Sequence, residues 1–383
     1  MRKLDGLKVA LVLGTAAGGV GRHVRSIAGG LVRRGARVVV CGPAATEELF
    51  RFTETGAWFA PVDVTDRPRP PADLRAVAAL RTLLRDADVV HAHGLRAGGL
   101  AVTACGGIVP GPLRLGRGRV PVVVTLHNAL LTGGLTGAAY GVLERIVASG
   151  ADQVLGVSPD LEERMLELGA RHVAHALVPA PATGARPGPE ARERLRAALR
   201  LGDRPLIITV GRLAEQKGLP MLLDAAAGWA RRDPVPLVAI VGDGPLEAEL
   251  RARIDAEGLP VRLLGRRSDV PGLLAAADVA VVSSVWEGQP LIVQEILRAG
   301  RPLVATRVGG VPAMLGAGES GDGAGLLVPS GDAAALERAV ARVLDDPALA
   351  ARLAESAARR AATLPTEDDA VEALALLYRG LRS

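Results

Sequence analysis

The sequence predicts two α/β domains, each built on a doubly wound parallel sheet, and three observations favour this fold class. The chain has 383 residues, 49% hydrophobic and 23% charged, which is too long for one ordinary core and suits two. Short apolar runs alternate with helical patterns, as in sheets of buried parallel strands. The segment PAPATGARPGP, residues 179–189, indicates a linker between two such series.

The first series predicts a Rossmann-like domain over residues 1–180. Its strand-like runs are KVALVLG, ARVVVCG, DVVHAHG, VPVVVTLH and DQVLGVS. The second series predicts a similar domain over residues 181–366, with the runs PLIITVGRL, PLVAIVGDG, VRLLGR, ADVAVVSS, RPLVATRVGG and GLLVP. A final helical pattern at residues 367–383 fits either domain, and one expectation is that it packs back on the first.

The charge distribution indicates the kind of partner. Residues 1–180 contain 21 Lys and Arg against 15 Asp and Glu, a net charge of +6, while the remainder has 25 against 26. The first half is therefore expected to face something acidic, such as a phosphorylated acceptor or a lipid headgroup. Aromatic residues make up 2% of the chain, which leaves few platforms for stacking bases, so no nucleic acid partner is expected.

The sequence favours a cytoplasmic protein. Its two cysteines offer neither a disulfide framework nor metal-ligand spacing. Asp5 and Lys8 interrupt the first apolar run, which therefore indicates a buried strand rather than a signal peptide. Residues 120–143 are uncharged for long enough to span a bilayer, but a histidine, an asparagine and four glycines indicate strand, loop and helix instead. Peripheral contact with the inner face of the membrane, through the basic first half, remains the alternative.

Rossmann-like sheets bind ligands at the carboxyl ends of their strands, so the loops there are expected to carry the chemistry, in a cleft between two facing domains. The loop LGTAAGGVGRHV, residues 13–24, places Gly18 and Gly19 before a helix whose free amides favour phosphate. It lacks the G-x-G-x-x-G pattern, and no acidic residue ends the second strand, so a nicotinamide dinucleotide is disfavoured. The alternative is that these glycines only allow the helix to pack closely on the sheet.

The loop VGRLAEQKGL, residues 210–219, places Arg212 and Lys217 near the start of a helix. Cations are unfavourable at that end of the helix dipole. Clamps on a diphosphate are therefore favoured over two solvated cations. Lysine at position 217 is itself unusual, because the chain has 43 arginines and three lysines.

Glycine turns after two further strands, VGDGPLEAEL at residues 241–250 and LLGRRSD at residues 263–269, are expected to form the wall of a base pocket. The residues expected there are Gly242, Gly265 and Arg266. For the first of these turns, at residues 241–250, the alternative is that its glycines serve packing alone.

Two glutamates stand in the apolar stretch SSVWEGQPLIVQEILRAGRPLVAT, residues 283–306. Glu287 lies in a loop and Glu295 in the following helix, with no Lys or Arg beside them in the sequence until Arg298. Phosphate repels a carboxylate, so both are expected to accept hydrogen bonds from sugar and ribose hydroxyls, the alternative being solvated glutamates on a helix face. The residues expected to begin the helix and border the ligand, with proline suited to the first turn, are Gly288, Gln289, Pro290 and Leu291. Together these loops describe a nucleotide-sugar site.

These residues resemble a known family. EGQPLIVQE has the E-x7-E pattern, and with GRLAEQKG, VGDGPLEAEL, LLGRRSDV and RPLVATRVGGVP it is similar to the retaining glycosyltransferases of family 4. The resemblance extends to GGVGRHV, VVHAHG and TLHN in the first half. It implies the GT-B fold, in which two Rossmann-like domains face each other across a cleft, with an acceptor domain first and a donor domain second.

The resemblance also implies roles for the residues of the second half. Glu287 matches the contact to the transferred sugar and Glu295 the contact to the ribose. Arg212 and Lys217 match the residues that bind the diphosphate. The loop of Gly19 matches one that approaches the diphosphate from the other domain.

His127 matches a cleft histidine implicated in the transfer step, although a lone histidine is more often structural.

Two features depart from the family pattern. Residues 178–185, VPAPATGA, replace a common Pro-Asn-Gly stretch, which puts interdomain contacts there in question. Ile296 stands where alanine commonly follows the second glutamate, where it either narrows the pocket or packs.

The implied function is retaining transfer of a hexose-type sugar from a UDP- or GDP-sugar to an acceptor hydroxyl, in cell-envelope glycolipid or polysaccharide biosynthesis. The sequence does not identify the acceptor, and a lipid-linked or phosphorylated one suits the basic first half. No cofactor and no metal are expected. Asp86 and Asp88 imitate a D-x-D motif but precede their strand, and no third ligand accompanies His91 and His93.

Three alternatives share the fold. A non-hydrolysing sugar-nucleotide epimerase would use the same donor and need no acceptor. A catalytically silent partner protein would lack the cations or glutamates, which this chain retains. A pyridoxal-phosphate phosphorylase is disfavoured, because Lys217 is already assigned and no lysine follows it.

Overall fold

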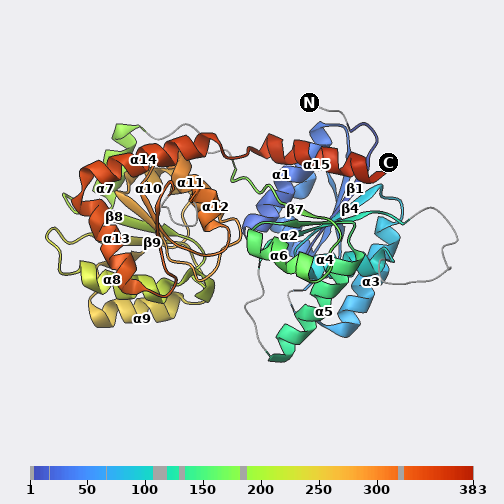
Figure 1. The fold of residues 1–383 in the computed structure, drawn as a ribbon, viewed down its shortest axis with the longest axis horizontal. Helices are drawn as coiled ribbons and strands as arrows, with labels where there is room; N and C mark the ends of the chain where they lie inside the picture. The colour runs from blue at the N-terminus through green and yellow to red at the C-terminus, as the bar shows by residue number, and fades with distance from the viewer. Residues whose placement is uncertain are drawn as a thin grey trace. The chain divides into compact units, whose positions relative to one another are not determined.

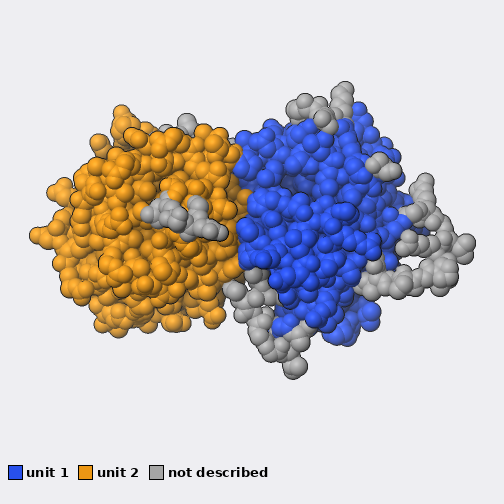
Figure 2. All heavy atoms as spheres, viewed as in Figure 1, with its two compact units in different colours: residues 1–181, 365–383 blue, residues 182–364 orange. Residues whose placement is uncertain are grey.

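The structure, a computed structural model, describes residues 4–16, 18–65, 67–106, 119–128, 134–181, 188–317 and 323–382. The chain forms two compact units, shown in blue and orange in Figure 2. Unit 1 comprises Met1–Pro181 and Pro365–Ser383, and unit 2 comprises Ala182–Leu364. Most of the expected linker, residues 182–187, lies outside the described residues.

Unit 1 is built on a parallel sheet of seven strands in the order β3-β2-β1-β4-β5-β6-β7. Figure 1 labels β1, β4 and β7 of this sheet. The strands are β1 (Lys8–Leu13), β2 (Arg37–Gly42), β3 (Trp58–Pro61), β4 (Val89–His93), β5 (Val122–Leu126), β6 (Gln153–Gly156) and β7 (Val173–His175). The helices are α1 (Gly19–Arg33), α2 (Ala44–Phe50), η1 (Phe52–Thr55), α3 (Pro70–Leu84), α4 (Leu95–Ala104), α5 (Gly134–Gly150), α6 (Pro159–Glu167) and α15 (Glu367–Arg382).

The strand order of unit 1 reverses between β1 and β4, which is where ligands of doubly wound sheets bind. Leu13 pairs with His93 across these strands, and His93 pairs in turn with Thr125 of β5. This register aligns the carboxyl ends of the three central strands. The loops that follow them, including that of His127, therefore start at one edge of the sheet.

The two edge strands of unit 1, β3 and β7, are not predicted by the sequence. β3 is WFAP and includes a proline, and its Trp58 is 74% exposed. β7 has only three residues, two of them exposed. Edge strands are not buried on both faces, so they lack the continuous apolar run by which the central strands are detected.

Helix α15 returns the end of the chain to unit 1, where it packs on α1. A Cβ on Gly30 of α1 would lie 2.4 Å from the side chain of Val371, so the two helices are in close contact. Arg34, at the end of α1, forms ion pairs of 3.5 and 3.6 Å with Asp368 and Glu372. The side chain of Tyr378 is fully buried.

Unit 2 is built on a parallel sheet of six strands in the order β10-β9-β8-β11-β12-β13, and the sequence predicted all six. The strands are β8 (Leu206–Val210), β9 (Leu237–Val241), β10 (Val261–Leu263), β11 (Val279–Val282), β12 (Leu303–Thr306) and β13 (Leu326–Val328). The helices are α7 (Pro189–Ala198), η2 (Glu215–Lys217), α8 (Leu219–Trp229), α9 (Glu247–Glu257), α10 (Val270–Ala276), α11 (Leu291–Ala299), α12 (Val311–Leu315), α13 (Ala333–Asp345) and α14 (Pro347–Ala362).

Both faces of the unit 2 sheet are buried, which explains its unbroken apolar runs. Leu206 and Ile208 of β8 belong to one hydrophobic cluster, while Ile207 between them belongs to another. Successive side chains of a strand point to opposite faces, so helices cover the sheet on both sides. Across the described residues, no helix combines the length and apolar character needed to cross a bilayer.

Candidate active site

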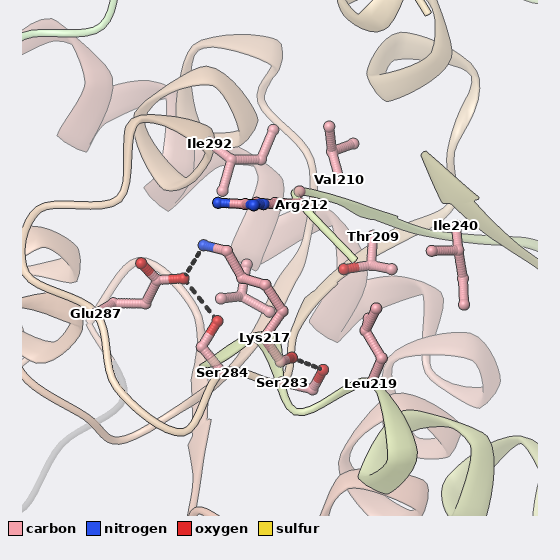
Figure 3. Close-up of a pocket in the computed structure, with 12 residues that line it drawn as sticks. Thr209, Val210, Arg212, Lys217, Leu219, Ile240, Ser283, Ser284, Glu287 and Ile292 are labelled. Atoms are coloured by element: carbon pink, nitrogen blue, oxygen red, sulfur yellow. Dashed lines mark hydrogen bonds and ion pairs between the residues drawn. The ribbon is translucent and has the colours of Figure 1, made fainter. Parts of the chain in front are cut away.

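A small pocket lies at the carboxyl ends of β8 and β11 in unit 2 (Figure 3). It brings together residues from two loops that are about 70 positions apart in the sequence: Arg212, Lys217, Ser283, Ser284 and Glu287. Its free volume is about 10 Å³, roughly the room for one water molecule.

Backbone packing fixes the loop that carries Arg212 and Lys217. Gly218 has φ +58°, and a Cβ there would lie 2.1 Å from the carbonyl oxygen of Ser283. Gly242 has φ +140°, and a Cβ there would lie 1.9 Å from the carbonyl oxygen of Gly211. Both positions therefore require glycine. Packing thus explains why position 242 is glycine, and the place of Gly242 in a base pocket stays a prediction.

Hydrogen bonds join this loop to the loop that carries Glu287. The Ser283 hydroxyl donates to the carbonyl of Lys217 at 2.9 Å, and the amide of Val285 donates to the carbonyl of Gln216 at 2.8 Å. The side-chain amide of Gln216 donates to the carbonyl of Trp286 at 3.0 Å. The two loops therefore hold each other at the end of the sheet.

Glu287 is the central group of the pocket. Its side chain is 6% exposed, and its Oε1 accepts hydrogen bonds from the ammonium of Lys217 and, at 2.6 Å, from the hydroxyl of Ser284. Figure 3 shows both donors converging on this oxygen. In the sequence, the nearest cation after Glu287 is Arg298, and the fold supplies Lys217 instead. A charge buried to this extent requires such partners.

The other predicted cations lie in more open surroundings. Arg212 lines the pocket and is exposed, and its guanidinium makes no hydrogen bond or ion pair with any part of the chain that the structure describes. Arg266, after the turn at Gly265, forms an ion pair of 3.3 Å with Asp243, and both side chains are more than half exposed. An exposed pair of this kind contributes little to stability.

Helix α11 begins at Leu291, whereas the sequence predicted that Gly288, Gln289 and Pro290 begin it. Pro290 is its N-cap, with extended backbone angles, rather than part of its first turn, so Leu291 begins the helix. Glu295 lies in the second turn and is partly buried, but it is not among the residues that line the pocket of Glu287. Ile296 packs in the hydrophobic core, which settles it as a packing residue.

Gly288, Gln289 and Pro290 connect Glu287 to α11. Gly288 and Pro290 are buried, and Gln289 is partly buried. The amide of Gly310 donates to the carbonyl of Glu287 at 2.9 Å, which anchors the start of this segment.

In unit 1, Gly18 precedes α1 and Gly19 begins it. A Cβ on Gly18 would meet nothing within 4 Å among the described atoms. Close packing therefore does not explain glycine at this position, although it was the alternative that the sequence left open.

Four histidines form a cluster in unit 1: His23 of α1 and His91 and His93 of β4 are buried, and His127 after β5 is partly buried. The His91 and His93 ring centroids are 4.2 Å apart, and those of His93 and His127 are 5.5 Å apart. Nδ1 of His93 lies 3.2 Å from Nε2 of His127. Among the described residues, no group of three or more His, Cys, Asp or Glu side chains is arranged to hold a metal ion.

Burial keeps these imidazoles neutral. Desolvation lowers the pKa of His127 to about 4, and desolvation together with the neighbouring His127 lowers the pKa of His91 to about 3. The pKa values of His23 and His93 are also well below the ordinary value, chiefly because of burial. His91 is held from both sides, with Nδ1 2.6 Å from the Tyr378 hydroxyl and Nε2 2.7 Å from the Thr125 hydroxyl.

No pattern in the sequence indicates that His23 and Tyr378 belong to this cluster. Tyr378 stands 287 residues after His91. No spacing rule links residues this far apart, so only the fold reveals the contact.

Two family models match the chain. The model described as Glycosyl transferase 4-like domain matches residues 18–181, and the model described as Glycosyl transferases group 1 matches residues 191–360. Together they cover most of both units.

Curated relatives of the chain are glycosyltransferases. An alpha-D-kanosaminyltransferase of Streptomyces kanamyceticus is 35% identical over 192 residues, which is 49% of each chain. A GDP-mannose-dependent alpha-(1-6)-phosphatidylinositol monomannoside mannosyltransferase of Mycolicibacterium smegmatis is 30% identical over 256 residues, 63% of this chain and 66% of the relative. The matches thus span about half to two thirds of the length of these relatives.

A solved structure resembles the whole chain. The crystal structure of HepE from Anabaena in complex with UDP has a TM-score of 0.81 and 21% identity, and the match covers 98% of this chain and 100% of that one. At this level of identity the likeness shows the fold, which is GT-B.

Proposed function

The chain belongs to the family 4 glycosyltransferases of the GT-B fold, and we propose that it transfers a sugar from a nucleoside diphosphate sugar to an acceptor hydroxyl. One observation carries the proposal: Lys217 and Arg212 line the same pocket as the buried carboxylate of Glu287. This combination of cations and an acceptor group fits a molecule that carries a diphosphate and hydroxyls.

In the proposed site, Arg212 and Lys217 bind the diphosphate. Glu287 accepts hydrogen bonds from the transferred sugar and Glu295 from the ribose. The segment from Gly288 to Leu291, which leads into α11, borders the phosphates. The turns at Gly242 and Gly265, with Arg266, bound the base, and Gly18 and Gly19 approach the diphosphate from unit 1.

The proposed reaction retains the configuration at the anomeric carbon. The acceptor hydroxyl attacks from the face that the diphosphate leaves, within an oxocarbenium-like ion pair. Negative charge grows on the leaving diphosphate, and Arg212 and Lys217 stabilise it, which is an electrostatic role. His127 lies near the transferred sugar in this proposal, as a neutral imidazole.

A UDP- or GDP-hexose is the proposed donor. The likeness to a structure with bound UDP supports a UDP-sugar donor, and a relative described as GDP-mannose-dependent supports a GDP-sugar donor. The proposed acceptor is a lipid-linked or phosphorylated molecule of the cell envelope, which suits the net charge of +6 in residues 1–180. The proposed setting is the cytoplasm, at or near the inner face of the membrane.

A two-stage screen tests the proposal. UDP- and GDP-sugars are first ranked by the thermal shift that each produces, and those that bind are then incubated with candidate acceptors and followed by mass spectrometry. We expect stabilisation by at least one donor, and an acceptor whose mass grows by one sugar. Conversion of a donor to its epimer without any acceptor would identify an epimerase instead. Absence of binding by every donor would indicate a catalytically silent member of the fold.

A further inference from the structure

The ion pair between Lys217 and Glu287 joins two groups to which the proposed function gives different ligands. Lys217 is the proposed clamp on the diphosphate, and Glu287 is the proposed acceptor for sugar hydroxyls, yet in the structure each binds the other. The pocket around them has room for about one water molecule. A sugar hydroxyl that binds the same oxygen of Glu287 therefore has to displace Lys217 or Ser284.

The structure indicates which side chain moves and which stays. Ser284 is buried, and its hydroxyl donates to the same oxygen of Glu287 at 2.6 Å. Its carbonyl accepts a hydrogen bond of 2.6 Å from the hydroxyl of Thr306, at the end of β12, and the carbonyl of Glu287 is held by the amide of Gly310. The ammonium of Lys217, in contrast, ends a flexible four-carbon side chain.

We propose that Lys217 is exchanged between Glu287 and the donor diphosphate, and that Ser284 is a positioning residue that holds the Glu287 carboxylate in place during the exchange. Phosphate oxygens draw the ammonium away, which opens the lone pairs of Glu287 to the hydroxyls of the sugar. Recognition of the diphosphate is in this way coupled to recognition of the sugar. The inference rests on the proposed function of the pocket.

The exchange has an energetic consequence that can be measured. Lys217 gains contacts to phosphate but loses a partner in Glu287, so the carboxylate competes with the ligand for the cation. Replacing Glu287 by glutamine removes that competition and should tighten nucleoside diphosphate binding. Simple repulsion between carboxylate and phosphate would also be relieved, but that relief would not depend on Lys217.

The first arm of the test observes Lys217 directly. The chain contains three lysines, so [15N]lysine labelling gives a simple spectrum in which a Lys217→Arg variant identifies one ammonium signal. We expect Glu287→Gln to shift that signal before any nucleotide is added, and UDP, GDP or pyrophosphate to shift it in the unaltered protein. An unchanged signal in the Glu287→Gln variant would overturn the exchange, because the ion pair would then not exist in solution.

The second arm measures dissociation constants of UDP and GDP by calorimetry. We expect Glu287→Gln to tighten the better-bound nucleotide by about tenfold, the scale of one charged hydrogen bond, and expect no such gain in a Lys217→Ala background. Glu215→Gln removes an exposed carboxylate two residues from Lys217, to which no ligand is assigned, and should not tighten binding. Ser284→Ala should weaken binding several-fold, because Glu287 then depends on Lys217 alone. Equal gains in both backgrounds, or an unchanged affinity in Ser284→Ala, would contradict the exchange.

The two proposals fail differently in this experiment. If UDP binds but leaves the Lys217 signal unchanged, the exchange fails and the proposed function stands. If UDP, GDP and pyrophosphate all fail to bind the unaltered protein, the proposed function fails, and the exchange fails with it.

Discussion

At the residue scale, Glu287 and Glu295 belong to one motif but lie in different surroundings. Glu287 is buried on a loop, where Lys217 and Ser284 bind its carboxylate. Glu295 lies on α11, is partly buried, and does not line that pocket. The two carboxylates are therefore suited to different parts of one ligand rather than to a shared hydroxyl.

The proposed ribose contact gives a prediction for Glu295→Ala. A hydrogen bond to a charged acceptor contributes about 1.5 to 3 kcal/mol, so donor affinity should fall by roughly ten- to a hundredfold. Titration of a donor and of its 2′,3′-dideoxy analogue measures the effect. The analogue should bind more weakly than the donor to the unaltered protein, but equally well to the variant. A penalty for the analogue that persists in the variant would exclude Glu295 as the ribose contact.

Sequence reasoning predicted the residue types of the pocket but not their partners. Arg212, Lys217 and Glu287 were selected because charged residues follow predicted strands, and the fold brings them into one pocket. The bond between Lys217 and Glu287 was not predicted, because the two residues are 70 positions apart. The ligands assigned to each of them remain predictions.

At the scale of elements, burial decides which strands the sequence reveals. The inner strands of unit 2 have long apolar runs because helices cover both faces of their sheet, as the two clusters beside β8 show. The edge strands β3 and β7 are short and partly exposed, so their sequences do not differ from those of loops. Helix α15 was predicted as a helix, but its contact with α1 depends on pairs such as Gly30 and Val371 that no local pattern indicates.

The contact between α15 and β4 gives a prediction for Tyr378→Phe. The variant leaves Nδ1 of the buried His91 without its partner, so the free energy of unfolding should fall by about 1 to 3 kcal/mol. Urea denaturation measures this change. Leu376→Ala, an exposed position on the same helix, is the control and should change stability by no more than about 0.5 kcal/mol. Equal stability of Tyr378→Phe and the unaltered protein would show that α15 does not depend on this bond.

The histidine cluster of α1, β4 and β5 predicts a pH dependence of stability. The pKa values of His127 and His91 are lowered to about 4 and about 3, so the unfolded chain takes up protons first as the pH falls. The free energy of unfolding should be highest above about pH 6.5. As the pH falls below this value, it should decrease by up to about 1.4 kcal/mol per pH unit for each histidine. Urea unfolding at several pH values between about 7.5 and 4.5 measures the slope.

A pair of variants assigns that slope to the cluster. His127→Gln removes one imidazole of the cluster and should give a shallower dependence on pH. His172→Gln changes an exposed histidine outside the cluster and should leave the slope as it is. A slope that is the same in all three proteins would mean that the buried rings do not cause it.

At the scale of the whole molecule, the two units carry different chemistry. Unit 2 holds the charged groups of the pocket, Arg212, Lys217 and Glu287, while unit 1 holds neutral buried histidines. The cations of unit 2 can supply the positive charge that a divalent metal would otherwise bring to a diphosphate.

This charge arrangement predicts that the enzyme needs no metal. Activity should be unchanged in EDTA, and the purified protein should contain no stoichiometric metal by elemental analysis. A loss of activity in EDTA that manganese or magnesium restores would contradict this prediction and weaken the role given to Arg212 and Lys217.

The central claim is that the pocket of unit 2 recognises a diphosphate, and comparing UDP and GDP with UMP and GMP tests it most directly. If Arg212 and Lys217 clamp the diphosphate, the unaltered protein should bind at least one nucleoside diphosphate tenfold or more tightly than its monophosphate, since each charged contact contributes about 1.5 to 3 kcal/mol. In the Arg212→Ala/Lys217→Ala variant, the two should bind alike. Equal binding of mono- and diphosphates by the unaltered protein, or a preference that survives in the double variant, would contradict the claim.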